Sequence, residues 1–350
     1  MFHFSPRNAL LPSTALAILL GLTACGGGGG SDDTTASASA SASAAAAAAA
    51  AGTASGAAAG AAAGTITTTT PPPALPTKAL GLTDQRASPV ATPNVVRLVG
   101  FDIATPNTLT TNVAIATAAG VGAAAFAANE WIFGMDYRPA DGLLWGLTNR
   151  GRLYTIDPTS GVATFKVALV ADPAAAGFTG LDASTSVSVD FNPVVDRMRV
   201  VTFTGQNLRI NVATGATIED TAVPQVATTG FSFVAGAAYT NSFAGATATT
   251  LFTINNSRDD LATQTPPNSG TQVPVGPLGV AISEVQGMDI AGSTNQLVLG
   301  ALSLNGAAGP HSLYNISLTT GAAVLRPATT GTAEIGGAAG LPLVDIAIRP

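Results

Sequence analysis

The residues whose type and spacing could do chemistry in this chain are four aspartates that return in a repeated phrase. The phrase reads Gly-Met-Asp-Tyr-Arg-Pro at 134–139 and recurs loosely about every 50 residues. Its carboxylates are Asp136, Asp190, Asp289 and Asp345. If equivalent strands bring them to one axis, they could bind a hard cation such as calcium. They could also supply the acid and base of a glycoside hydrolase or lyase.

A structural role for these aspartates is the favoured interpretation. An aspartate beside a turn often accepts backbone N–H groups and so fixes the next strand. One repeat has Ala238 in place of the aspartate, and a structural role tolerates such a loss. The chemical roles stay open as alternatives. The enzyme alternative would be favoured if any two residues among these four aspartates, Glu130 and Glu284 lay within about 10 Å of each other in one cleft.

Other reactive groups are scarce. Cys25 is the only cysteine, and His3 and His311 are the only histidines, which excludes zinc sites of several histidines and cysteine-dependent catalysis in the folded part. His311 follows a Gly-Pro pair and is expected in a solvent-exposed turn. The glycine runs match no phosphate-loop spacing, which argues against nucleotides. A net charge of -6 argues against nucleic acid.

The start of the chain predicts export and lipidation. The apolar stretch Ala9–Leu22 is too short to span a bilayer comfortably and predicts a signal peptide over residues 1–24. Leu22-Thr23-Ala24-Cys25 resembles a bacterial lipobox, which implies that Cys25 is lipidated and becomes the mature N-terminus. Gly26 follows instead of aspartate, which by the same resemblance favours the outer membrane, on its periplasmic face or at the cell surface.

Two regions follow the signal peptide. Residues 25–93 consist mainly of Ala, Gly, Ser, Thr and Pro, a composition that predicts a disordered tether because it offers too little apolar surface to repay the entropy of ordering. Residues 94–350 are long enough for one large β domain. They contain no cysteine, so their stability must come from strand pairing and core packing.

Within residues 94–350 the repeat predicts units of four strands. The first unit has strands expected at Trp131–Tyr137, Leu143–Thr148, Arg152–Ile156 and Val162–Leu169, separated by turns rich in Gly, Pro and Asx residues. Leu343–Ile348 resembles a first strand, and Leu98–Asp102 with Thr108–Ile115 resembles a third and a fourth. We therefore predict an all-β, five-bladed propeller closed by pairing the two ends of the chain in one blade. Six blades, or a β-solenoid, are the alternatives.

This arrangement resembles a family of bacterial exported proteins that carry domain of unknown function 4394. The resemblance covers about Val96–Pro350. It rests on Leu98–Asp102, Gly134–Pro139, Leu153–Asp157, Ser188–Pro193 and Asp345–Pro350. It implies secretion and a propeller-like repeat, and it brings no activity and no catalytic residues.

Two functions from different classes are open. The favoured one is a lipid-anchored binding or scaffold protein that uses a propeller face to hold a protein or glycan at the cell envelope. The alternative is a carboxylate-dependent glycoside hydrolase or lyase. The expected partners are the membrane, through Cys25, and an envelope protein or glycan; calcium is the one cofactor considered. A sugar-stacking platform is less favoured than core packing for Trp131, Tyr137, Trp145, Tyr154 and Phe191.

Overall fold

The computed structural model describes residues 74–83, 95–175, 177–184, 186–224, 233–283, 286–292, 294–304, 310–338 and 340–350. The chain divides into two units, Met1–Thr69 and Thr70–Pro350, and every described residue belongs to the second. The predicted signal peptide, Cys25 and the first part of the predicted tether lie outside the described residues. No helix within the described ranges is long and apolar enough to cross a membrane.

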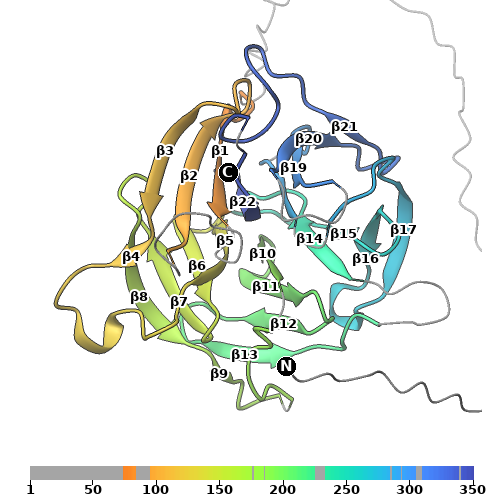
Figure 1. The fold of residues 1–350 in the computed structure, drawn as a ribbon. Coiled ribbons are helices and arrows are strands. Elements are labelled where there is room, and N and C mark those ends of the chain that lie inside the picture. Colours follow the sequence, from red (N-terminus) through yellow and green to blue (C-terminus); the bar gives the residue numbers. More distant parts are fainter. Residues whose placement is uncertain are drawn as a thin grey trace, which may run out of the picture. The chain divides into compact units, whose positions relative to one another are not determined.

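The second unit is an all-β propeller of five blades (Figure 1). Blade 1 contains β22 (Leu343–Ala347), β1 (Lys78–Thr83), β2 (Arg97–Asp102) and β3 (Leu109–Ala114). Blade 2 contains β5 (Ile132–Tyr137), β6 (Leu144–Thr148), β7 (Arg152–Ile156) and β8 (Val162–Ala168). Blade 3 contains β10 (Val187–Asn192), β11 (Arg197–Thr202), β12 (Asn207–Ile210) and β13 (Ala216–Glu219).

Two further blades complete the ring. Blade 4 contains β14 (Val234–Tyr239), β15 (Leu251–Asn255), β16 (Asp260–Gln264) and β17 (Gln272–Pro277). Blade 5 contains β18 (Gly287–Ile290), β19 (Val298–Leu302), β20 (Ser312–Ile316) and β21 (Ala323–Leu325). Two short 3-10 helices, η2 (Gly122–Ala124) and η3 (Pro267–Ser269), lie in connections. The predicted fold class and the five blades are confirmed.

The position of a strand in its blade decides its burial. The inner strands β14 and β18 are buried at every residue, because each blade packs between two neighbours. The outer strands β3 and β8 alternate between exposed and less exposed residues, because one of their faces meets solvent. The cores therefore lie between the inner and middle strands of adjacent blades, as in the cluster that joins Leu82 of blade 1 to Met135 of blade 2.

Blade 1 closes the ring with strands from both ends of the chain. β22 pairs antiparallel with β1, and β1 pairs antiparallel with β2. The predicted first, third and fourth strands of this blade are present as β22, β2 and β3. The second strand, β1, lies inside the range 25–93, so the tether prediction is wrong for Lys78–Thr83. Its six residues are a short apolar pattern that the composition of the surrounding segment concealed.

Turn glycines join neighbouring blades at their outer edge. Gly161 and Gly215 precede β8 and β13 with φ of 74° and 75°, a conformation that favours glycine. A Cβ at Gly215 would overlap with the carbonyl oxygen of Ala168 in the preceding blade. At the same joints the short strands β4 (Ala116–Thr117) and β9 (Val170–Ala171) pair in parallel with β8 and β13. The chain that follows β3 and the chain that follows β8 therefore each add a short strand to the sheet of the next blade.

The close approach at Gly215 predicts a large difference between two glycine substitutions. Gly245 has a similar φ of 82° but open space where its Cβ would lie, so Gly245→Ala should cost only the backbone strain, about 1–2 kcal/mol. Gly215→Ala adds the overlap with the neighbouring blade and should cost about 1–3 kcal/mol more. Urea unfolding followed by tryptophan fluorescence measures both. Equal losses of stability would show that the joint is not tightly packed.

Candidate functional site

The structure brings the four recurring aspartates together on the inner strands. Asp136 lies on β5, Asp190 on β10, Asp289 on β18 and Asp345 on β22, and Ala238 occupies the equivalent place on β14. Carboxylate oxygens of Asp136, Asp190 and Asp289 lie within 4.8 Å of one another. All four aspartates are only 2–4% exposed. The repeat therefore builds a buried cluster of carboxyl groups where the inner strands meet.

Each carboxylate of this cluster contacts the backbone of the next blade. The Met135 N–H donates to Oδ2 of Asp345 at 2.9 Å, and the Phe191 N–H donates to Oδ2 of Asp136 at 3.0 Å. The Oδ1 atom of Asp345 accepts the N–H of the following residue, Ile346, at 3.0 Å. A carboxylate on one inner strand thus holds that strand to its neighbour around the ring.

The same pattern continues in the remaining blades, with one interruption. The N–H groups of Ile290 and Ile348 donate to the two oxygens of Asp289. The backbone N–H of Tyr239 donates to Asp190, whose Oδ1 has no hydrogen-bond partner among the described residues. Ala238 has no carboxylate, so no such bond leads from blade 4 to blade 5. We call Asp136, Asp190, Asp289 and Asp345 the carboxylate ring.

Burial dominates the electrostatics of the carboxylate ring. Loss of hydration raises the pKa of Asp289 from 3.8 to about 7, although two backbone N–H groups oppose the shift. Burial and the negative charge of neighbouring aspartates raise the pKa of Asp136 and of Asp190 well above the ordinary range. The pKa of Asp345 is also raised well above 3.8, mainly by burial. The folded state therefore favours protonated carboxyl groups here.

The burial of the carboxylate ring limits the reactions in which its aspartates can take part. The acid and base of a glycoside hydrolase must reach a substrate in an open pocket. The ring residues are almost completely buried, and the three pockets described below are lined by other side chains. Glu130 is engaged elsewhere, because it pairs with Arg152 at 2.8 Å and accepts the Thr148 hydroxyl at 2.7 Å. Glu284 lies outside the described residues.

His311 differs from the prediction, because it is buried and not solvent-exposed. Its Nδ1 accepts the N–H of Leu343, the first residue of β22, at 3.1 Å. The segment before β22 covers it, since the N–H of Ile335 donates to the His311 carbonyl and the N–H of His311 donates to the carbonyl of Leu341. The Gly-Pro pair indicated a turn but not the long connection that packs over it.

The aromatic residues considered as a sugar platform pack in the interior. Tyr137, Trp145, Tyr154 and Phe191 are buried, and Trp131 is partly buried. The Tyr154 ring meets the rings of Phe126 and Phe165 edge-on, with centroids 4.8 and 5.5 Å away. These flat side chains are therefore part of the contacts between strands and not a surface for sugar rings.

One face of the propeller is formed by the loops that follow the inner strands and the loops that precede the outer strands. The inner strands are neighbours around the ring and each begins a blade with the same order of strands, so they run in the same direction. The loops after the inner strands and before the outer strands therefore share a face. We call this the upper face and define it by residues 74–77, 103–108, 138–143, 157–161, 193–196, 211–215, 240–250, 265–271, 291–292, 294–297, 317–322 and 349–350.

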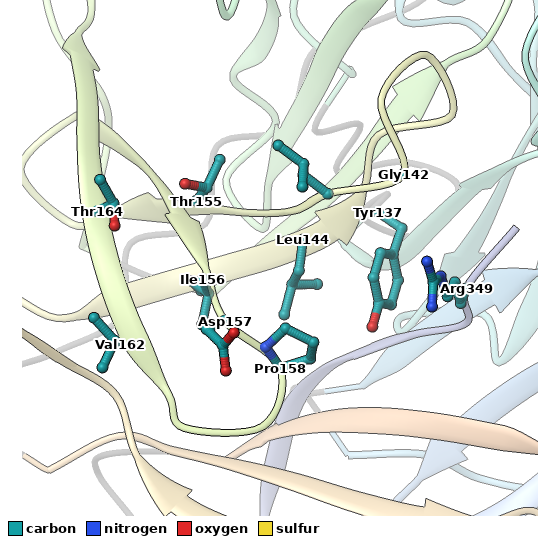
Figure 2. Close-up of a pocket in the computed structure, with 11 residues that line it drawn as sticks. Tyr137, Gly142, Leu144, Thr155, Ile156, Asp157, Pro158, Val162, Thr164 and Arg349 are labelled. Atoms are coloured by element: carbon teal, nitrogen blue, oxygen red, sulfur yellow. The ribbon is translucent and has the colours of Figure 1, made fainter.

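Two pockets on the upper face share one arginine. The first, of about 360 Å³, is shown in Figure 2, with Arg349 and Tyr137 at one end and Val162 and Thr164 at the other. The second, of about 440 Å³, is formed by residues 74–78, Phe243, Ala291, Gly292, Thr294, Arg349 and Pro350. Burial raises the pKa of Tyr137, and the positive charge of Arg349 opposes this shift. Arg349 is exposed and forms no ion pair with another described residue.

A third pocket on the upper face has two arginines in its wall that are already paired. It has a volume of about 180 Å³, and Arg199 and Arg209 line it. Both form ion pairs with Asp220, at 2.7 and 2.6 Å, whereas Arg197, which also lines the pocket, donates to the backbone carbonyls of Val195 and Asp196. Arg138, in a nearby loop, is likewise held by Asp141 at 2.8 Å and by Asp196 of the next blade. Arg349 differs from Arg138, Arg199 and Arg209 because it forms no ion pair with another described residue.

Exposed apolar side chains lie among the loops of the upper face, and none of them was predicted from the sequence as part of a site. Half of the large apolar residues that are exposed in the described chain lie in these loops or directly beside one of them. They are 36–53% exposed and are Leu75, Leu143, Val162 (the residue after the 157–161 loop), Val194, Val195 and Phe243. A signal was present in the sequence, because the apolar residues Leu143, Val194 and Val195 stand in turns, where polar residues are usual. Four of these residues, Leu75, Leu143, Val162 and Phe243, also line the two pockets that share Arg349, and exposed apolar side chains beside a pocket are typical of a surface that meets another molecule.

The blades and the carboxylate ring define a β-propeller of five blades. The chain belongs to the family described as Domain of unknown function (DUF4394), whose model matches residues 97–339. The resemblance stated from the sequence is thereby confirmed. No curated protein matches the chain.

Two solved structures show a distant likeness. A structural genomics protein of unknown function from Bacteroides thetaiotaomicron VPI-5482 is 11% identical, with 77% of this chain and 85% of that chain covered and a TM-score of 0.33. BamB from Moraxella catarrhalis is 14% identical, with 70% and 73% covered and a TM-score of 0.25. Likenesses at this level carry no information about the function of this chain.

The raised pKa values predict that the metal-free protein loses stability as the pH rises. A carboxyl group whose pKa is raised by folding stabilises the folded state while it is protonated. For Asp289 this contribution is complete below pH 3.8 and is lost as the pH rises through about 7. We expect a higher urea midpoint at pH 5 than at pH 8 in chelator, and a smaller difference in Asp289→Asn. A midpoint that increases from pH 5 to pH 8 in both proteins would contradict the prediction.

Proposed function

We propose that this protein is a lipid-anchored binding or scaffold protein of the cell envelope, and that it holds its partner on the upper face of the propeller. The observation that carries the proposal is the coincidence, on this one face, of two pockets, exposed apolar side chains and Arg349, which is exposed and forms no ion pair with another described residue. The carboxylate ring, in contrast, is turned inward and bonded to backbone. A rigid ring with a varied loop face suits binding.

The chemistry of the upper face favours a protein partner over a glycan. The exposed groups are mainly aliphatic, with Phe243 as the aromatic exception, and the rings considered as a sugar platform are buried or partly buried. Arg349 lies between the two pockets, where its planar guanidinium can bind a carboxylate in two-pronged fashion. We infer a protein segment in which a carboxylate stands beside aliphatic side chains.

The N-terminal part of the chain supports a place at the cell envelope. The lipobox-like sequence at Cys25 would supply the anchor, and the residues after it would supply reach. The described chain begins at Ala74, which lines one of the upper-face pockets. The segment that leads from Cys25 therefore joins the propeller on the face that we assign to the partner.

Replacement of the lipidated residue should release the protein from the membrane. The lipid is attached through the thiol of Cys25, so Cys25→Ser should move the protein from the membrane fraction of its native host to a soluble fraction. Metabolic labelling with a lipid precursor should mark the wild-type protein and not the variant. Arg349→Glu is the matched control and should stay in the membrane fraction. A Cys25→Ser protein that remains there and carries label would exclude this anchor.

Site-specific crosslinking in the native host tests the upper face. We expect photoreactive side chains at Leu143 and at Phe243, one in each pocket, to capture the same protein, identified by mass spectrometry. A photoreactive group at Val324, which is 62% exposed on the outer strand β21, is the control and should not capture it. Adding Arg349→Glu should reduce the yield at least about tenfold, as for an interface arginine.

Three other results of the crosslinking would be informative. Equal capture from all three positions would show that the upper face is not the binding surface. Adducts with glycan alone would mean that the partner class is wrong while the face is right. Unchanged yield in Arg349→Glu would remove the carboxylate from the description of the partner.

A further inference from the structure

The carboxylate ring has no counter-charge that the described chain provides. Every hydrogen bond to these aspartates in the described residues comes from a backbone N–H group, and none comes from a lysine or arginine side chain. Buried charged groups in proteins are either paired, neutralised by protons or bound to metal ions. The ring therefore needs protons or a cation at its centre.

An unbonded oxygen distinguishes one member of the ring. Asp136, Asp289 and Asp345 each use both carboxylate oxygens to accept backbone N–H groups, whereas Oδ1 of Asp190 has no partner among the described residues. The Ser188 hydroxyl is also buried without a partner, and it lies on the same side of β10 as Asp190 because strand side chains alternate. Buried polar atoms are rarely left unpaired in folded proteins. The unpartnered Oδ1 of Asp190 stands in the cluster with Asp136 and Asp289, which indicates a ligand among these carboxylates.

The spacing of the oxygens fits one calcium ion. Calcium binds oxygen ligands at about 2.3–2.6 Å, so two ligands on opposite sides of the ion are at most about 4.6–5.2 Å apart. The carboxylate oxygens of Asp136, Asp190 and Asp289 lie within 4.8 Å of one another, inside this limit. Magnesium holds its ligands at about 2.0–2.1 Å and would require a tighter cluster. A separation at the 4.8 Å limit fits calcium and exceeds the span of about 4.0–4.2 Å that two opposite magnesium ligands allow.

We propose that Asp136, Asp190 and Asp289 bind one calcium ion on the axis of the propeller. The three residues come from blades 2, 3 and 5, so the ion would connect strands that are not all neighbours. It would also connect blade 3 to blade 5 across blade 4, where Ala238 interrupts the bonds of the carboxylate ring. The role of the ion is to complete the ring, and it is independent of the partner on the upper face.

Equilibrium dialysis of the full-length protein with radioactive calcium at pH 7.5 tests the site. We expect one ion per chain, and a higher Tm in calcium than in chelator, because a ligand that binds only the folded state stabilises it. Asp190→Asn should weaken binding at least about tenfold and abolish the Tm shift. Asp157→Asn, an exposed aspartate in the turn before β8, is the matched control and should retain both.

The location of the ion can be determined without a variant. Crystals of the wild-type protein soaked in terbium, which takes the place of calcium, should give one anomalous peak between the three carboxylates. No bound calcium in dialysis and equal Tm values with calcium and chelator would overturn the proposal and leave protons as the neutralising species. A peak elsewhere, or binding that survives in Asp190→Asn, would overturn it as well.

Discussion

The fold depends on closure of the ring, which brings a strand from the C-terminus beside a strand from the N-terminal part. β22 contacts blade 5 and pairs with β1, and both contacts are needed for every blade to have two neighbours. Cys25 is the only cysteine of the chain, so no disulfide fixes this closure. Hydrogen bonds between strands, the buried clusters between blades and the His311 contact to Leu343 hold it. An open ring would expose sheet edges that invite aggregation.

Neighbouring blades are joined by two kinds of contact, one near the axis of the propeller and one at its rim. Near the axis, a carboxylate of one inner strand accepts a backbone N–H of the next. At the rim, the end of one outer strand pairs with the outer strand of the following blade, beside a glycine that lets the backbones approach. The rim contacts are uncharged, whereas the axial ones place carboxyl groups where water is excluded. Backbone N–H groups stabilise these carboxyl groups only in part, because burial still raises their pKa values.

The sequence predicts the repeat far better than it predicts the surface. The blades could be found because inner strands need buried residues at fixed positions and turns need glycine, proline or Asx residues. β1 could not, because six residues within a segment of low complexity give too weak a pattern, and its strand character comes from the partners β22 and β2. The burial of His311 could not be predicted either, because it depends on the connection before β22, which comes later in the chain and packs over this residue. The aspartates were identified by their spacing, but their bonds to the next blade required the geometry of the ring.

The axis and the upper face are separate, so substitutions at the axis and substitutions on the upper face have different effects. A change in the carboxylate ring alters bonds that hold inner strands together, so its first effect is on stability. A change at Leu143, Phe243 or Arg349 alters exposed side chains on loops, whose backbone is positioned by the strands below them. Binding specificity can therefore vary on the upper face without disturbing closure. Ala238 shows that the axis also tolerates the loss of one aspartate, provided that the neighbouring strands remain packed. Both of its neighbours along the ring, Asp190 and Asp289, belong to the group that we assign to calcium.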